Sequence, residues 1–358
     1  MAPSVSRRTL PRSLPSYRAA AYRTYRALSH HFRAGHGLFY KYAGGGKYAG
    51  VWAAAQAIDG TVELARLPGG GVGSRPIRAM FRSLRFYWDR SGGSPGYDKD
   101  VRAPFGSGGY RFYDDNVLVG LALIRGYELT HDQVMLARAE QVFAFEVGGW
   151  DRNAADPFPG GVFWTQSPKS HNRNTVSTAG AAQLGLHLYL LTGKRHYLRW
   201  AIKMYSWVNS TMRAPDGLYW DRVNRNGRIH TAIWSYNQGL MLGDDALLYR
   251  ATGEGSYLNS ARTLADTAVA FYRHHNRLVK QRPIFNGIFF ENLLALDRLA
   301  PNPAYRRLAE AYVRFLGRYT DRSSGLLWVS HQPELLDQAA LLQLNASIAS
   351  KDRRMPTG

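Results

Sequence analysis

Two kinds of predicted helix alternate along this chain. Between residues 117 and 124 every side chain except one glycine is hydrophobic, and such an all-round apolar helix is typical of one that is covered on every side. After a short turn, the next helical segment is apolar on one face only, as in a helix with one side in water. The pattern therefore predicts helical hairpins, each with an inner and an outer helix.

The hairpin recurs every 50–60 residues or so, which is the mark of stacked helix pairs. Corresponding alanines of the outer helices are Ala79, Ala139, Ala201, Ala261 and Ala309. Thr-Gly at two of the turns fits a helix that ends with glycine in the left-handed conformation. A further pair, formed by the last helix (334–347) closing on the first (17–32), brings the number to about six. We therefore predict an all-α fold, a closed (α/α)6 barrel, with an open superhelix as the alternative.

Glycine- and aromatic-rich loops follow the outer helices and precede the inner ones. They span residues 35–50, 88–113, 148–173, 212–237, 281–290 and 321–333. Because all of them join outer to inner helices, we expect them at one face of the barrel, where functional residues carried by loops would gather. We expect one barrel domain over residues 18–350, a basic disordered arm over 1–17 and a flexible tail over 351–358.

Charge and composition narrow the function classes. The chain has 358 residues, 46 Lys and Arg against 26 Asp and Glu, a net charge of +20, and no cysteine, which excludes disulfides, a thiol nucleophile and thiolate metal sites. A strongly basic chain raises the possibility of nucleic-acid binding. The arginines, however, are scattered one or two per helix, so we favour solvated helix faces, with attraction to an anionic polymer as the alternative.

Targeting signals are weak. No apolar run approaches the ~20 residues that a membrane-spanning helix needs, so no transmembrane segment is predicted. Ser6-Arg7-Arg8 resembles a twin-arginine start, but prolines and an arginine follow in place of an apolar stretch. As given, the sequence has no export signal, which indicates a cytoplasmic location by default, and we expect a monomer.

Two adjacent carboxylates, Asp114 and Asp115, directly precede an apolar helix. One interpretation is structural, because aspartate at a helix start caps free backbone N–H groups. The other is a paired-carboxylate site. Neighbouring Cα atoms lie 3.8 Å apart, so the two carboxyl groups can approach the ~5 Å separation of a retaining glycosidase, and crowding separates their pKa values.

Further candidates lie in other loops. Trp234, Tyr236, Asn237 and Gln238 surround the start of a second inner helix, and Gly161 and Trp164 belong to a glycine turn that leads into aromatic residues. An indole ring can pack on the apolar face of a sugar, although each tryptophan could equally be part of the core. The histidines show no metal-ligand spacing, and no phosphate-loop lysine follows the glycines. We expect neither a metal nor a cofactor.

Seven motifs occur in an order that resembles glycoside hydrolase family 76, the endo-α-1,6-mannanases of bacteria and fungi. They are Asp114-Asp115-Asn116 and residues 124–130, 149–151, 160–164, 234–239, 248–253 and 285–289. The resemblance runs from about residue 20 to residue 346. The chain departs from the family at Tyr113, Pro159 and Phe163, where other residues are usual, and at Glu291, where a basic residue is common.

The resemblance implies an (α/α)6 barrel and a retaining mechanism on α-1,6-linked mannan, without a metal. Asp114 would be the nucleophile and Asp115 the acid and then the base. The full set of expected substrate-binding residues is Tyr113, Asn116, Gly161, Trp164, Trp234, Tyr236, Asn237 and Gln238. The expected partner is a mannan-type polysaccharide or a lipid-anchored mannan, and proteins of this family are usually secreted or surface-associated.

Three other functions remain open. One is another (α/α)6 carbohydrate-active enzyme, such as an unsaturated glucuronyl hydrolase or a sugar epimerase. Another is a catalytically inactive glycan-binding protein, and the last is a nucleic-acid binder, against which the scattered charge argues.

Overall fold

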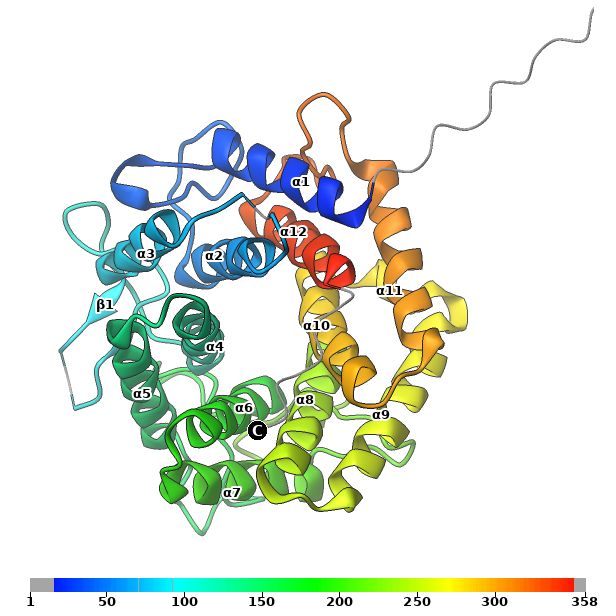
Figure 1. Ribbon diagram of the computed structural model, residues 1–358. Coiled ribbons are helices and arrows are strands. Elements are labelled where there is room, and N and C mark those ends of the chain that lie inside the picture. The colour runs from blue at the N-terminus through cyan, green and yellow to red at the C-terminus, as the bar shows by residue number, and fades with distance from the viewer. Residues whose placement is uncertain (1–15, 70, 92, 351–358) are drawn as a thin grey trace, which may run out of the picture.

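Two concentric rings of helices make up the protein (Figure 1). The structure, a computed structural model, describes residues 16–69, 71–91 and 93–350. The inner ring consists of α2 (Val51–Ala65), α4 (Tyr113–Thr130), α6 (Thr175–Thr192), α8 (Ser235–Thr252), α10 (Pro283–Leu299) and α12 (Leu335–Ala349). The outer ring consists of α1 (Tyr17–His31), α3 (Ser74–Ser83), α5 (Gln133–Gly148), α7 (Arg195–Thr211), α9 (Gly255–Arg273) and α11 (Pro303–Leu316). The predicted all-α (α/α)6 barrel is confirmed.

The last helix closes the ring. α12 packs against α10 on one side and α2 on the other, and it pairs with α1, as predicted. The alternative of an open superhelix is therefore wrong. Residues 1–15 of the expected arm and the whole expected tail, 351–358, lie outside the described residues. Tyr17, which falls both in the arm expected over 1–17 and in the helix predicted over 17–32, is the first residue of α1, and the Ser16 hydroxyl caps this helix by accepting from the Ala19 N–H at 3.3 Å.

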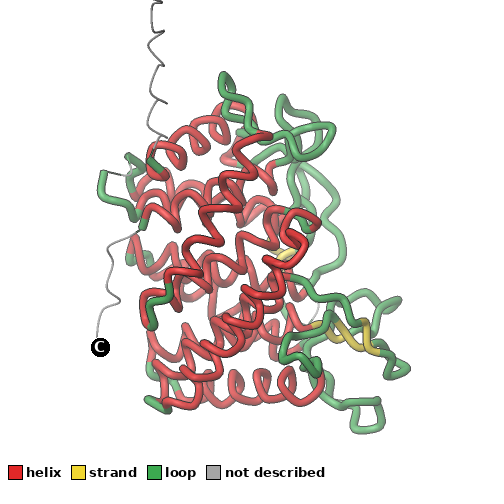
Figure 2. Tube along the Cα trace, turned by 90° about the vertical axis from the view of Figure 1, so that its right-hand side faces the viewer, coloured by secondary structure: helices red, strands yellow, loops and turns green. Residues whose placement is uncertain are grey.

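The long loops gather at one face of the barrel, and short turns occupy the other (Figure 2). The loops contain the 3₁₀ turns η1 (Gly35–Gly37), η2 (Leu84–Phe86), η3 (His274–Lys280) and η4 (Gly317–Tyr319). They also contain an antiparallel hairpin, β1 (Trp88–Asp89) with β2 (Gly96–Tyr97), and a small antiparallel sheet of β3 (Arg173–Asn174), β4 (Arg222–Val223) and β5 (Ile229–His230).

Two expected boundaries were wrong. The loop expected over residues 281–290 is mostly helix, because α10 begins at Pro283, and proline suits the first turn of a helix. The helix expected near Val117 begins at Tyr113, so Asp114 and Asp115 stand inside the first turn of α4 rather than before it.

At five of the six inner helices, a polar side chain at the same position, here called a loop brace, holds the preceding loop in place. The fourth helical residue carries a hydrogen-bonding side chain, which reaches back to the loop before it. These residues are Asn116, Thr178, Gln238, Asn286 and Gln338. Gln238 is typical: its side chain accepts from the Tyr219 N–H at 2.8 Å and donates to the Tyr219 carbonyl at 2.9 Å. The buried loop backbone is thus paired where no sheet could pair it.

The barrel axis is filled with side chains. Below the loop face, Arg125 of α4 forms ion pairs with Asp59 of α2 and Glu291 of α10, and Gln183 donates to Asn292 at 2.9 Å. The cavity left among these side chains is about 10 Å³, room for one water molecule at most. The barrel is therefore a packed core that forms a floor under the loop face.

Close approach of α8 to α10 depends on Gly239. A Cβ atom there would lie 2.6 Å from the Phe289 Cα atom, which is backbone and cannot rotate away. Gly239→Ala should lower the free energy of unfolding by about 1–3 kcal/mol, measured by urea denaturation. Gly255→Ala is the matched control, because nothing lies within 4 Å of a Cβ at that helical position. We expect it to be neutral or slightly stabilising, and an equal loss in both variants would contradict the close-packing explanation.

Candidate active site

A cavity of about 560 Å³ opens among the loops, above the barrel floor. Its walls come from first turns of inner helices and from the loops that precede them. The lining residues are Trp52, Asp114, Asp115, Leu118, Trp164, Asn172, Asn174, Val176, Asp221, Arg222, Trp234, Tyr236, Lys280, Gln281, Arg282, Phe285 and Ile288. Aromatic rings and charged groups thus face one space, as in many ligand sites.

Asp114 and Asp115 both line this cavity, but their hydrogen bonding differs. The Asp114 carboxylate accepts from the Trp164 indole Nε1 at 3.0 Å and from the Asp115 backbone N–H at 3.0 Å. Asp114 therefore does satisfy a free backbone donor at the helix start, as the capping interpretation predicts. The Asp115 carboxyl has no hydrogen-bond partner among the described residues. Hydrogen-bond donors therefore hold the Asp114 carboxylate in place, whereas the Asp115 carboxyl faces the cavity without such a donor from the described part of the chain.

Burial and mutual repulsion shift the two pKa values unequally. Burial raises the pKa of Asp114 to about 6, although the donors from Trp164 and the backbone oppose the shift, and Asp221 adds to it. Burial and the adjacent Asp114 charge raise the pKa of Asp115 well above its ordinary range. Hydrogen bonds to a carboxylate favour its charged form. When one proton is present on the pair, it therefore resides on Asp115.

Two further acids influence this pair. Asp221 lines the cavity and is ion-paired with Arg222 at 2.5 Å, and burial raises its pKa. Glu146 lies on α5, fully buried, and its carboxyl oxygens have no hydrogen-bond partner among the described residues. Burial raises the pKa of Glu146 well above its ordinary value, with a contribution from Asp114. Burial and the nearby Asp114 thus both favour the protonated form of Glu146.

An aromatic wall stands on another side of the cavity, centred on Phe285 in the first turn of α10. Tyr236 and Trp234 meet the Phe285 ring edge-on, with centroids 4.5 and 5.7 Å away. Trp52 stacks on it with centroids 6.3 Å apart. This apolar surface can pack against the C–H face of a sugar ring and exclude water from the acids.

The loop before α6 fixes the start of α4. The Tyr113 N–H donates to the Trp164 carbonyl at 2.9 Å, and the Trp164 N–H donates to the Asn172 carbonyl at 2.8 Å. The Phe112 ring meets the Trp164 ring edge-on at 5.1 Å. Trp164, expected as a sugar platform, thus also positions Asp114.

Five of the ten expected site residues line the cavity, and five do not. Asp114, Asp115, Trp164, Trp234 and Tyr236 do. Tyr113 instead stacks on Phe145 at 4.5 Å, Gly161 packs under the Trp207 ring, and Asn237 donates to the Trp220 carbonyl at 3.3 Å. Asn116 and Gln238 are two of the loop braces and are fully buried. These five residues support the walls of the cavity rather than facing it.

Sequence reasoning missed Asp221, Trp52 and Phe285. Asp221 follows Trp220 in one of the expected loops, and this Trp-Asp pair was a signal that could have been noticed. Trp52 belongs to the first turn of α2, where a ring in an apolar helix looks like core. Phe285 stands in one of the seven motifs and in the loop expected over 281–290, but it belongs to the first turn of α10. Among the described residues, no helix is long and apolar enough to cross a membrane, and no group of three or more acids or histidines could hold a metal ion.

A sequence model of glycosyl hydrolase family 76 matches residues 17–331. A mannan endo-1,6-α-mannosidase of Saccharomyces cerevisiae is 29% identical in an alignment 256 residues long, gaps included, which covers 62% of this chain and 55% of the relative. The chain spans about a quarter to just over half the length of the curated relatives it matches.

Solved structures share the fold. A family 76 mannosidase of Bacteroides thetaiotaomicron is 24% identical and covers 93% of this chain and 98% of its own, with a TM-score of 0.82. An α-1,6-mannanase of a Salegentibacter species, 22% identical over 93% of this chain and 99% of its own, has a TM-score of 0.76. That protein was solved as an inactive variant, with two consecutive aspartates changed to asparagine, in complex with α-1,6-mannotriose.

The raised pKa of Asp114 has a consequence for stability. The folded state keeps a proton that the unfolded chain loses near pH 4, so this residue makes folding less favourable as the pH rises from about 4 to about 6. Asp114→Asn removes this effect and keeps a carbonyl oxygen for the Trp164 indole. Relative to wild type, the variant should gain about 1–3 kcal/mol in free energy of unfolding between pH 4 and pH 8, measured by chemical denaturation.

Asp321 provides a control, because its pKa is shifted in the opposite direction to that of Asp114. Hydrogen bonds from Ser323 and Ser324 hold the pKa of this exposed carboxylate well below its usual range. Asp321→Asn should be less stable than wild type at pH 8 and show no gain between pH 4 and pH 8. A gain of equal size in both variants would mean that the effect does not arise from the buried acid.

Proposed function

The chain belongs to glycoside hydrolase family 76, and we propose that within this family it is a retaining endo-α-1,6-mannosidase that hydrolyses α-1,6-mannan-type glycans. The observation that carries the proposal is the pair of adjacent carboxyl groups with unequal pKa values, which face one cavity beside an aromatic wall. The proposed nucleophile is Asp114, and the proposed acid and base is Asp115.

The substrate class is supported by the relatives. The yeast relative is named a mannan endo-1,6-α-mannosidase, and the Salegentibacter structure holds an α-1,6-linked mannan fragment. The latter was made inactive by changing two consecutive aspartates, the same pattern as Asp114 and Asp115 here. The cavity adds a physical reason, because flat rings and hydrogen-bonding groups on its walls suit a sugar with one apolar face and several hydroxyls.

The first step needs one ionised and one protonated acid. Asp114, ionised above about pH 6, attacks the anomeric carbon while the Asp115 proton passes to the departing glycosidic oxygen. The C–O bond to the leaving sugar breaks, and a bond from the anomeric carbon to an Asp114 oxygen forms. The Trp164 indole and the Asp115 N–H steady the attacking carboxylate from the other side.

The second step depends on the loss of the negative charge of Asp114. Once Asp114 is esterified it is neutral, so the repulsion that raised the pKa of Asp115 is relieved and Asp115 is stable as a carboxylate. It then removes a proton from a water molecule, which attacks the anomeric carbon and releases Asp114. Two displacements at the same carbon restore its original configuration.

Replacing Asp114 and replacing Asp115 should lower the rate in ways that depend differently on the leaving group of the substrate. Asp114→Asn should lower kcat by about a thousandfold or more on any substrate, because the nucleophile is gone. Asp115→Asn should lose as much on α-1,6-mannan oligosaccharides. On a mannoside whose phenol leaving group needs no proton, its kcat/KM, which reports only the first step, should fall far less. Product lengths and anomeric configuration from the wild type, followed by NMR, report the endo and retaining character.

Circular dichroism verifies the fold of both variants, and Asp156→Asn in the same barrel face is the matched control, which should retain activity. Binding of mannan oligosaccharides without any product would identify an inactive glycan-binding protein. Cleavage of unsaturated glucuronides alone would identify a different (α/α)6 enzyme. Full activity of both variants would exclude the paired-aspartate mechanism.

The pH profile tests the role of Trp164. The rate should rise through about pH 6 as Asp114 ionises and fall at higher pH as Asp115 loses its proton. Trp164→Phe keeps a ring but removes the indole donor that lowers the pKa of Asp114, so the acidic limb of kcat/KM should move to higher pH while the alkaline limb moves less. An unchanged acidic limb would mean that Asp114 is not the group that must be ionised.

A further inference from the structure

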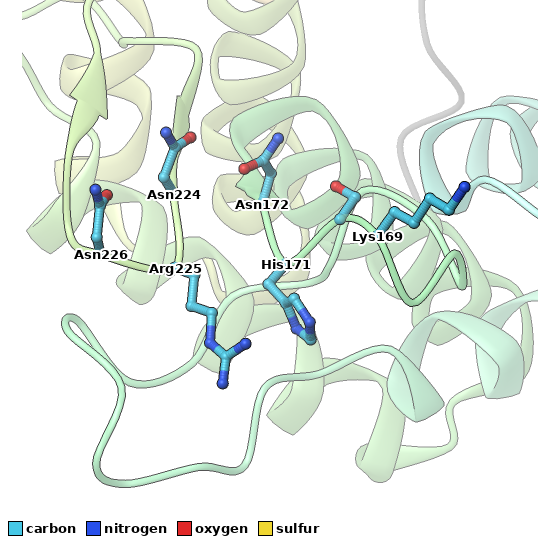
Figure 3. Close-up of a pocket in the computed structure, with 7 residues that line it drawn as sticks. Lys169, His171, Asn172, Asn224, Arg225 and Asn226 are labelled. Atoms are coloured by element: carbon cyan, nitrogen blue, oxygen red, sulfur yellow. The ribbon is translucent and has the colours of Figure 1, made fainter.

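A second hollow adjoins the cavity. It lies between the loop before α6 and the β4–β5 turn, with a volume of about 580 Å³. Figure 3 shows the two facing segments, with Asn224, Arg225 and Asn226 on the turn and Lys169, His171 and Asn172 on the loop. The side chains of Arg225 and His171 extend in the same direction from their two segments.

The hollow is basic, and its cations are not neutralised. Its lining contains a lysine, an arginine and a histidine but no carboxylate. Among the described residues, neither Lys169 nor Arg225 forms an ion pair. By contrast, Arg222 and Arg282 of the neighbouring cavity are both paired with carboxylates. Unpaired cations in one hollow are available to an anion from outside the protein.

The hollow borders the cavity at Asn172. Asn172 lines both, and its carbonyl accepts from the backbone of Trp164, whose indole holds Asp114. On the other side, Arg222 of the cavity and Arg225 of the hollow stand three residues apart along the same hairpin. A glycan that lies in the cavity and extends past Asn172 would enter the hollow.

We propose that this hollow is a subsite for a phosphate group carried by the glycan substrate. The hollow is lined by a guanidinium fork, a histidine and side-chain amide donors, with the Lys169 ammonium group on its far side, and such groups suit a tetrahedral oxyanion better than they suit neutral hydroxyls. The proposal rests on the proposed function, since it is the sugar chain in the cavity that brings the phosphate to the hollow. It assigns a role to part of the net charge of +20, namely selecting an acidic glycan over a neutral one.

The experiment compares glycans that differ only in phosphate. The substrates are linear α-1,6-mannotetraose, the same tetraose with a phosphate monoester on one terminal mannose, tested at each end, and a tetraose joined through a phosphodiester to a glycerolipid. We expect kcat/KM for one phosphorylated form to exceed that for the neutral tetraose by about tenfold, through KM, at low salt. The advantage should shrink as salt rises, because the cations are exposed. The monoester and diester arms tell a phosphorylated sugar from a lipid anchor.

Lys169→Gln combined with Arg225→Gln should reduce this ratio to nearly one. The matched control is Arg228→Gln, an exposed arginine of the same hairpin that does not line the hollow, and it should keep the preference. Equal kcat/KM for all the substrates, a ratio unchanged in the double variant, or the same loss in Arg228→Gln would each overturn the subsite.

Binding separates this proposal from the proposed function. Calorimetry with Asp114→Asn measures affinity for the phosphorylated and neutral tetraoses without turnover. If no glycan is hydrolysed by the wild type but the phosphorylated one binds more tightly, the hydrolase proposal fails and the subsite stands. If both are hydrolysed and bind alike, the reverse holds. Equally tight binding of a single-stranded oligonucleotide of the same charge would show a general anion surface and overturn the subsite.

Discussion

The cavity depends on a hydrogen bond that recurs between inner helices and the loops before them, at five of the six inner helices that the structure describes. Long loops carry backbone N–H and C=O groups that must be paired when they are buried, and this barrel has only short strands to pair them. A polar side chain at the fourth position of an inner helix does so instead, as Gln238 does for Tyr219. Because the inner helices are packed on all sides, each brace ties its own loop to the rigid part of the molecule. Walls made of loops can then hold a fixed geometry.

Burial of Asp114 and Asp115 in this cavity both lowers the stability of the fold and raises the pKa values on which the proposed reaction depends. Burial raises the pKa of both acids, and the different donors around them make the two shifts unequal. In water, two adjacent aspartates would titrate close together near pH 4. Here Trp164 and a backbone N–H favour the charge on Asp114, while Asp115 has no such donor. The assignment of nucleophile and acid thus follows from which oxygen atoms accept hydrogen bonds.

Sequence reasoning succeeded where the signal was local or periodic. Apolar periodicity gave the rings, the repeat gave the number of hairpins, and adjacency in the chain placed Asp114 beside Asp115. It did not separate residues that face a cavity from those that brace a loop, because Asn116 and Tyr236 both stand at the start of an inner helix and only packing tells them apart. Phe285 comes from the first turn of α10 and Asp221 from the loop before β4, both far from the acids in the sequence, and only the closed ring brings them to the acids. A signal for the braces did exist: Asn116, Thr178, Gln238 and Asn286 follow one another at 62, 60 and 48 residues, the same steps as the outer-helix alanines.

Closure by α12 has a consequence for how such a chain can change. Gln338 and Gln343 of the last helix reach the carbonyl of Thr24 and the side chain of Asp59 in the first two helices. The first two helices therefore make these contacts only after the last helix has been synthesised. An open array of helix pairs can gain or lose a unit by gene duplication or deletion and still stack. In this ring, removing one hairpin would leave α12 unable to contact both of its neighbours. Adding one would widen the core that Arg125 now fills. Closure therefore fixes the number of repeats, and changes of length are tolerated best in the loops.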